Sequence, residues 1–451
     1  MTPDMQQTPW HFSRFMNPGV FCGVIAAFSL QAAPGAAPGP ATGLDMPWDW
    51  SGVIGTGQSL AVGQGGVPVQ STNQPWSNLK LSTGGLSWPV DPNDTNLAMA
   101  PLVEPIGRLA RGYPSSWPDN IAGETPHSAM ANQISALVRA ASGRDFIGVH
   151  GEVGENGQGM TFLKKNATQR GVNGRSYQAA LIETKAIARL AKAAGKTYGV
   201  GAIILTHGES DAGNANYEND LYNLWLDFNA DLPAITGQTR KIQMIVSQQN
   251  SCNDRSASTL AQWKAGVDHS AEIVCSGPKY QYPSGEGIHL TAEGYQQLGE
   301  KYGQIYYQRV VLGHNWQPLQ PAGIQRDGAV FTVHYHVPEP PLVWEAAFPA
   351  PHPSIAGWKQ GKGFEVSTAG GERVAIDSVS ISGDAVIIAC ASDPGPNARV
   401  GYAMIGERAR MTAPFAGTFR WGLLRDSDPF QGATSRTPQP NYGVAFEMSV
   451  P

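Results

Sequence analysis

From residue 51 to about residue 312, short apolar runs alternate with longer amphipathic stretches, and this alternation limits the possible folds more than any other feature. The apolar runs predicted as strands are 52–55, 146–150, 200–206, 242–247 and 272–275. The stretches predicted as helices, most with apolar residues at three- and four-residue spacing, are 133–141, 177–194, 217–228, 258–267 and 291–311. Strands separated by helices predict a three-layer α/β fold, with helices on both faces of a parallel sheet and ligands beyond the carboxyl ends of the strands.

After about residue 315 the pattern changes to short or alternating apolar runs separated by Gly, Pro and Asp turns. These runs are 329–337, 374–381, 385–391 and 400–404. They predict an all-β domain over 315–451. The exposed aromatic residues Trp344, Trp358 and Trp421 would let this domain bind carbohydrate. The alternative is that the domain only braces the first one. We favour bracing.

The composition is that of a globular protein. At 451 residues, with 41% hydrophobic and 15% charged residues, the chain is long enough for two domains with buried cores. A formal net charge of −5, without any run rich in Lys and Arg, makes nucleic acid an unfavoured partner.

Residues 1–36 are predicted to be a signal peptide or a disordered leader. Residues 20–30 are apolar and are followed by small residues, but this run is too short to span a bilayer. We therefore expect secretion or periplasmic export and no membrane span. The alternatives are a disordered tail and a start codon assigned too early. Cys22 lies inside the apolar run without a lipid-attachment context.

The cysteine positions leave one pairing open. Cys252 and Cys275 each follow or end a predicted strand, so they form either a disulfide or two separate buried thiols. Cys390 is predicted to be a small core residue. No spacing of cysteine and histidine resembles a zinc site, so neither a metal nor another cofactor is implied.

Residues 62–132 form a connection that is much longer than a compact domain needs, which favours a functional loop. Its tryptophans, Trp76, Trp88 and Trp117, either line an acceptor surface or pack the loop onto the sheet. We favour packing.

The glycine-rich segment 55–60 follows the first predicted strand and contains Ser59. A serine at such a turn can act as a nucleophile. The glycines allow a tight turn and leave backbone N–H groups near Ser59 that can stabilise an oxyanion.

Two further polar segments occupy corresponding places in the chain. Residues 205–211 end the run 200–205 and contain His207, Glu209 and Asp211, which either form a ligand site or cap the next helix through Ser210 or Asp211. Residues 285–291 precede the last helix of the first domain. In this segment, Glu286 can hold one nitrogen of His289 while the other accepts a proton from a nucleophile.

Taken together, these segments resemble the motifs of the SGNH hydrolases, also called GDSL-type esterases, and within them the branch of sialate O-acetylesterases and acetylxylan esterases. The blocks of that branch read Gly-Gln-Ser-Asn, Gln-Gly-Glu-Ser-Asp and Asp-Gly-x-His-Leu-Thr. The chain matches them in the same order with 57–60, 207–211 and 286–291. The resemblance covers about 48–312, as an SGNH or flavodoxin-like catalytic domain. Residues 363–404 look like the β-sandwich appended to some of these esterases.

The resemblance implies a role for each site residue. The catalytic triad would be Ser59, His289 and Glu286. The oxyanion hole would be formed by the N–H groups of Ser59 and Gly157, with Gly154 as second choice for the glycine, and by the side chain of His207. The substrate-binding residues would be Gln58, Glu209 and Asp211.

Three positions depart from the family pattern. His207 replaces Gln or Asn, Glu286 replaces Asp, and Leu60 replaces Asn. The first makes the third oxyanion donor depend on the tautomer of an imidazole, and the second lengthens the carboxylate side chain by one methylene.

The function implied is hydrolysis of carboxylic esters, above all short-chain esters such as O-acetyl groups on carbohydrate, by two-step acyl transfer through an acyl-enzyme. One alternative is a broad aryl or alkyl esterase, a thioesterase or a polyester hydrolase on the same fold. Another is a catalytically degenerate glycan-binding protein. The sequence does not predict the oligomeric state.

Overall fold

The computed structural model describes residues 43–83, 89–107, 121–167, 175–250, 256–285, 288–347, 360–404 and 420–451. All of these described residues belong to one compact unit. The expected leader, with Cys22, lies outside the described residues, so export stays a prediction. Among the helices that the structure describes, none is both long and apolar enough to cross a bilayer.

The N-terminal part of the described chain is built on a seven-stranded sheet with the order β3-β2-β4-β1-β5-β6-β7. The strands are β1 (Trp50–Gly57), β2 (Leu79–Ser82), β3 (Ala98–Pro101), β4 (Gly148–Glu152), β5 (Tyr198–Thr206), β6 (Gln243–Val246) and β7 (Ile273–Cys275). The five strands predicted from the sequence pair in parallel, as expected. The long connection 62–132 adds β2 and β3, and because β3 is antiparallel to β2 the sheet is mixed at this edge.

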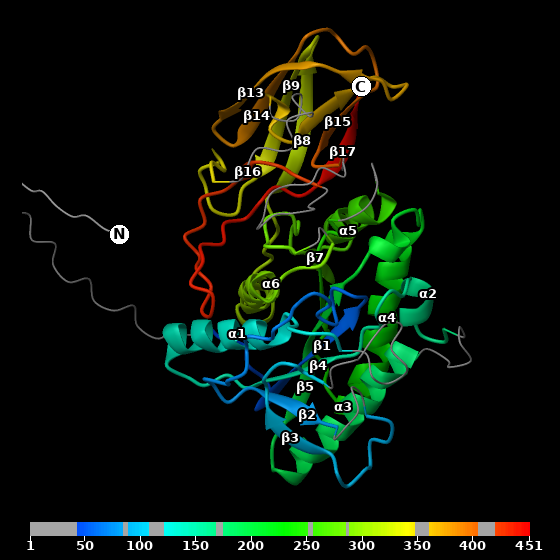
Figure 1. The fold of residues 1–451 in the computed structure, drawn as a ribbon, viewed down its shortest axis with the longest axis vertical. Helices are drawn as coiled ribbons and strands as arrows, with labels where there is room; N and C mark the ends of the chain where they lie inside the picture. Colours follow the sequence, from blue (N-terminus) through cyan, green and yellow to red (C-terminus); the bar gives the residue numbers. More distant parts are fainter. Residues whose placement is uncertain are drawn as a thin grey trace, which may run out of the picture. The chain divides into compact units, whose positions relative to one another are not determined.

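Helices cover both faces of this sheet (Figure 1). They are α1 (His127–Ser142), α2 (Met160–Leu163), α3 (Arg175–Ala193), α4 (Tyr217–Thr236), α5 (Ala257–Asp268) and α6 (Ala292–Tyr306), with a short 3-10 turn η2 (Glu209–Asp211) and a π-helical turn η3 (Tyr307–Val311). Successive residues of a strand point to opposite faces. Val53 belongs to the same buried apolar cluster as Met130 of α1, whereas Ile54 belongs to the cluster that contains Tyr177 of α3. All five predicted helices are present, with shifted ends.

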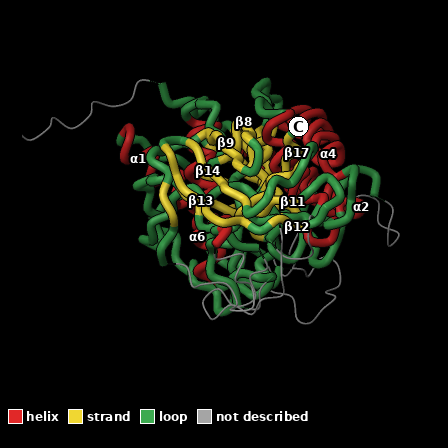
Figure 2. The backbone as a smooth tube through the Cα atoms, turned by 90° about the horizontal axis from the view of Figure 1, so that it is seen from above, coloured by secondary structure: helices red, strands yellow, loops and turns green. Residues whose placement is uncertain are grey.

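The C-terminal part forms two four-stranded antiparallel sheets, as predicted for a β-sandwich. Their orders are β13-β14-β9-β8 and β12-β11-β15-β17, and β10 and β16 form a separate pair. Figure 2 shows β13, β14, β9 and β8 side by side in this order. The strands are β8 (Gln320–Asp327), β9 (Val330–His336), β10 (Val343–Trp344), β11 (Phe364–Ser367), β12 (Arg373–Val374), β13 (Ile376–Ser382), β14 (Ala385–Cys390), β15 (Ala398–Tyr402), β16 (Leu424–Arg425) and β17 (Phe446–Val450).

Hydrogen bonds join this part to the sheet domain. The carboxylate of Glu300 in α6 is fully buried and accepts from the backbone N–H groups of Thr434 and Ser435, each at 2.7 Å. The side chain of Gln248, after β6, exchanges two hydrogen bonds with the backbone of Ala445, at 2.8 Å each. These contacts are compatible with a bracing role. The division of the chain at residues 312–315 stays a prediction.

Two expectations about single residues need correction. Cys275 is a free, buried thiol, so the disulfide alternative is wrong for this residue, and Cys252 lies outside the described residues. Trp421 is 3% exposed and therefore offers no surface for carbohydrate. Trp344 and Trp76 are half-buried. The remaining candidate tryptophans, Trp88, Trp117 and Trp358, lie outside the described residues. Cys390 is a core residue, as predicted.

Candidate active site

Ser59 follows the carboxyl end of β1, the middle strand of the seven-stranded sheet, and is 6% exposed. Gly57 makes the turn possible because its φ is +144° and because a Cβ there would overlap the backbone carbonyl of Thr206 at the end of β5. The N–H of Ser59 forms no hydrogen bond with any residue that the structure describes. This backbone donor is therefore available to a bound group.

The segment 207–211 lies directly against the Ser59 turn. Gln58 donates its N–H to the carbonyl of Thr206 at 3.3 Å, and its buried side-chain oxygen accepts from the N–H of Ser210 at 3.0 Å. These bonds fix the two loops to each other. The first two motifs, about 150 residues apart in the chain, thus meet at the carboxyl ends of β1 and β5.

The glycine-rich loop after β4 joins the same edge. Glu155 donates its N–H to the carbonyl of Gly57 at 2.9 Å, and the side chain of Asn156 donates to the side chain of Gln64 at 3.3 Å. Gly157 is exposed, has a φ of +71°, and its N–H forms no hydrogen bond within the described part of the chain. Its carbonyl lies 3.4 Å from the hydroxyl of Ser210.

His289 comes to this edge from the segment before α6. A Cβ added to Gly65, in the turn that starts at Ser59, would lie 2.9 Å from the Cβ of His289. Tyr295 of α6 donates its hydroxyl proton to the carbonyl of Gln64 at 2.6 Å and holds the same turn. Thr291 caps α6 by accepting from the N–H of Gly294. Glu286 lies outside the described residues, so its pairing with His289 stays a prediction.

His207 is fully buried, and both of its ring nitrogens have protein partners. Nε2 lies 2.9 Å from the carbonyl oxygen of Gln158, which can only accept, so Nε2 carries a proton. Nδ1 then accepts from the hydroxyl of Tyr217 at 2.6 Å. Burial lowers the pKa of His207, which favours this neutral form. The geometry therefore does not support the expected oxyanion donor, because a substrate would have to displace Gln158.

Glu209 forms a buried ion pair that the sequence did not reveal. Its Oε1 accepts from Nζ of Lys279 at 3.1 Å, and the two side chains are 5% and 1% exposed. Lys279 follows β7, far along the chain, and belongs to none of the motifs. Glu209, which was expected to bind substrate, is thus paired with Lys279 inside the protein.

Asp211 accepts at Oδ2 from the N–H of Met160, the first residue of α2, at 2.7 Å. The same oxygen lies 3.7 Å from Nε2 of His207. The alternative that Ser210 or Asp211 caps the next helix is wrong, because α4 starts at Tyr217 with Asn216 as its N-cap.

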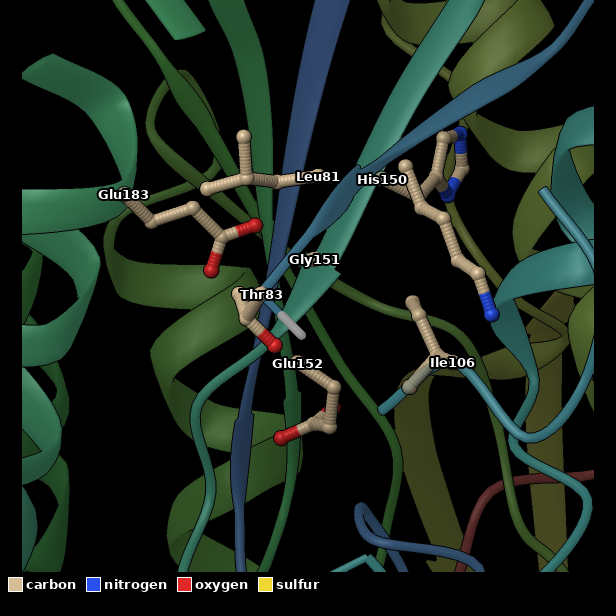
Figure 3. A pocket seen from close by; sticks show the side chains of 8 residues that line it. Leu81, Thr83, Ile106, His150, Gly151, Glu152 and Glu183 are labelled. Carbon is tan, nitrogen blue, oxygen red and sulfur yellow. The ribbon is translucent and has the colours of Figure 1, made fainter. Parts of the chain in front are cut away.

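A cluster of buried titratable groups lies beneath the site, around β4, and no motif pointed to it. It consists of His127, His150, Glu152 and Glu183. Figure 3 shows Glu183 approaching β4 from one side, at Gly151, and His150 on the other side. The cavity lined by His150, Glu152 and Glu183 measures about 10 Å³, enough for no more than about one water molecule, so it is no substrate pocket. Within the described part of the chain, no group of three or more His, Cys, Asp or Glu is arranged to hold a metal ion.

The buried carboxyl group of Glu183 should make the stability of the folded protein depend on pH. Burial, with the nearby charge of Glu152, raises the pKa of Glu183 to about 8. The native state then keeps this proton at pH values where the unfolded chain, with an ordinary pKa near 4.5, releases it. The contribution of Glu183 to stability is present below about pH 4.5 and is lost as the pH rises to about 8.

We therefore expect Glu183→Gln, which cannot titrate, to gain thermal stability over the wild type as the pH rises from 5 to 8. Unfolding temperatures of both proteins at unit pH steps measure this difference. If the unfolding temperatures of the two proteins change with pH in the same way, the raised pKa of Glu183 is contradicted.

The comparisons with known proteins bear on the fold. No protein-family model matches the chain, and no curated protein matches its sequence. Among solved structures, XAC1771, a carbohydrate acetylesterase from Xanthomonas citri, aligns with a TM-score of 0.55 and 12% identity over 88% of this chain and 80% of that chain. The chain has the fold of this esterase. This confirms the predicted α/β domain with a β-sandwich.

Two other structures align less well. Est24, a carbohydrate acetylesterase from Sinorhizobium meliloti, has a TM-score of 0.30 and 12% identity over 57% of this chain and 96% of that chain. NanS has a TM-score of 0.37 and 11% identity over 57% of this chain and 97% of that chain. These scores are too low to add to the argument.

Proposed function

We propose that the protein is a serine esterase that hydrolyses O-acyl esters of carbohydrate, acetyl esters above all. One observation carries the proposal: the loops of Ser59, Gly157 and His289 converge on one sheet edge, and the first two offer N–H groups without partners among the described residues. A nucleophile, a base and two backbone donors are the groups that acyl transfer needs. That XAC1771, with the same fold, is a carbohydrate acetylesterase supports carbohydrate as the alcohol part of the substrate.

In the proposed reaction, Oγ of Ser59 attacks the ester carbonyl carbon while His289 accepts the hydroxyl proton. The carbonyl oxygen becomes an oxyanion held by the N–H groups of Ser59 and Gly157. As the intermediate collapses, the sugar hydroxyl leaves with the proton from His289. Water then attacks the acyl-enzyme with His289 again as base, releasing the acid and Ser59. Glu286 would orient His289.

We assign Gln58, His207, Glu209 and Asp211 to holding the site loops together. The reason is that each has an intramolecular partner on another loop: Ser210 N–H, the Gln158 carbonyl, Lys279 and Met160 N–H. Glu209 keeps one buried carboxylate oxygen without a hydrogen bond among the described residues.

The experiment that tests this function is labelling with a fluorophosphonate, which modifies only activated serines. We expect one adduct on the folded protein, at Ser59, and release of acetate from acetylated xylan or acetylated sialic acid. A folded protein that is not labelled but binds glycans would instead be a degenerate binding protein. A labelled protein that prefers longer acyl chains or polyesters over acetylated carbohydrate would be the broader esterase.

A further inference from the structure

Three buried side chains form a chain of hydrogen bonds beneath the Ser59 turn. Glu152 ends β4, His127 starts α1, and His150 lies in β4. Nε2 of His127 lies 3.1 Å from Oε2 of Glu152, and Nδ1 of His127 lies 3.2 Å from Nδ1 of His150. All three residues are at most 4% exposed. None of them belongs to the three sequence motifs or to the proposed chemistry.

The chemistry of the groups gives this chain a direction. A carboxylate only accepts, so Nε2 of a neutral His127 carries the proton, and Nδ1 must accept. His150 then donates from its Nδ1 to His127, which leaves Nε2 of His150 as a bare acceptor. This agrees with the surroundings, because Nε2 of His150 is buried without a hydrogen-bond partner among the described residues. Burial and the neighbouring His127 lower the pKa of His150, which is consistent with a neutral ring.

The other oxygen of Glu152 connects the chain to the active-site loop. Oε1 accepts from the N–H of Gly154 at 2.5 Å. Gly154 lies against the backbone of Gly57, since a Cβ at position 154 would be 2.9 Å from both the nitrogen and the oxygen of Gly57. Through Glu155 and Gln158 the same loop reaches Gly157. The carboxylate thus fixes the start of the loop whose end carries the proposed oxyanion donor.

We propose that His150, His127 and Glu152 are positioning residues. They fix the loop after β4 so that the N–H groups of Gly157 and Ser59 can donate to the same oxyanion. This inference rests on the proposed function. Oxyanion donors contribute most when the protein holds them in place before the reaction, so a small displacement of the loop weakens transition-state binding more than substrate binding.

Glu152→Gln is the decisive variant. Its amide oxygen can still accept from Gly154, but its NH2 group then faces the Nε2–H of His127. To restore a hydrogen bond, His127 must move its proton to Nδ1, and His150 must then carry its proton on Nε2, where no acceptor is present among the described residues. A buried donor without an acceptor is costly, so we expect the loop to shift.

The expected result for Glu152→Gln with p-nitrophenyl acetate is a loss of about 10- to 100-fold in kcat at nearly unchanged KM, less than the roughly 100- to 1000-fold typical of removing a donor. The inhibition constant of a trifluoromethyl ketone, which adds to the serine as an oxyanion, should rise by the same factor. The matched control is Glu183→Gln, the same exchange at a buried neighbour with no bond to Gly154, which should keep the wild-type kcat.

If the Glu152→Gln protein fails to fold, a second pair of variants, at His150, tests the same inference. The side-chain amide of His150→Asn reaches about the place of Nδ1 and can still donate to His127, whereas His150→Leu has no donor. We expect His150→Asn to keep kcat and His150→Leu to lose it.

Four results would overturn the inference: wild-type kcat in Glu152→Gln, an effect confined to KM, equal losses in both glutamate variants, or equal kcat in both His150 variants. Ser59→Ala separates this failure from that of the proposed function. If Ser59→Ala abolishes hydrolysis while the positioning variants do not, the esterase stands and only the positioning role is wrong.

Discussion

Ser59→Ala is expected to lower kcat/KM for p-nitrophenyl acetate by several orders of magnitude, on the order of 10⁴ to 10⁶. Without the hydroxyl no acyl-enzyme can form, and the remaining N–H donors can only assist direct attack by water. Because the loss concerns a bond made in the reaction itself, it should appear in kcat. Hydrolysis followed at 405 nm measures it directly.

The fold must survive this change for the result to be informative. Ser59 is almost fully buried, but its side chain forms no hydrogen bond with the described residues, so we expect the unfolding temperature to stay close to that of the wild type. Ser380→Ala, the same exchange at an exposed position in β13, is the control and should keep full activity. If Ser59→Ala hydrolyses the ester like the control, Ser59 is not the nucleophile.

The parallel part of the sheet could be predicted because buried strands are nearly continuous apolar runs. The run 200–206 corresponds to β5, which is buried along its whole length. The edge strand β2 escaped prediction since its four residues, Leu-Lys-Leu-Ser, are mostly half-buried and too few to show an alternation. Its antiparallel neighbour β3 is equally short. Both lie within a connection rich in Gly, Pro and Asn, which hid them.

Helix α1 shows a second limit. Its apolar periodicity suggested a start at residue 133, but the helix starts at His127. Its first turns bury polar residues, among them His127, Ser128 and Asn132, because they are hydrogen-bonded inside the protein. A hydrophobic pattern cannot reveal such residues, since their burial depends on partners elsewhere in the chain.

Dependence on partners far along the chain also explains which parts of the candidate site could be predicted and which could not. Ser59 and His289 stand in short segments whose neighbours already point to the chemistry. Lys279 does not, because its partner Glu209 is 70 residues away and no spacing connects them. The pair formed by His127 and Glu152 is equally invisible in the sequence. Only the fold shows which buried polar groups meet.

Gly55→Ala is the structural change with the largest expected effect, a loss of about 3–5 kcal/mol in the free energy of unfolding from overpacking and a broken buried hydrogen bond. A Cβ at position 55 would overlap both Nε2 of His127 and Oε2 of Glu152. Strand β1 cannot move aside, because it is paired on both edges with β4 and β5. The methyl group must therefore separate the two side chains and break the buried hydrogen bond between Nε2 of His127 and Oε2 of Glu152.

Urea unfolding of the wild type, Gly55→Ala and Gly213→Ala measures this effect. Gly213 is exposed and a Cβ there meets no atom within 4 Å, so its variant should stay within about 0.5 kcal/mol of the wild type. If the methyl group acts by colliding with the imidazole, Gly55→Ala combined with His127→Ala should be more stable than the sum of the single changes predicts. Strict additivity, or a Gly55→Ala cost as small as that of Gly213→Ala, would mean that the pair of His127 and Glu152 does not lie against β1.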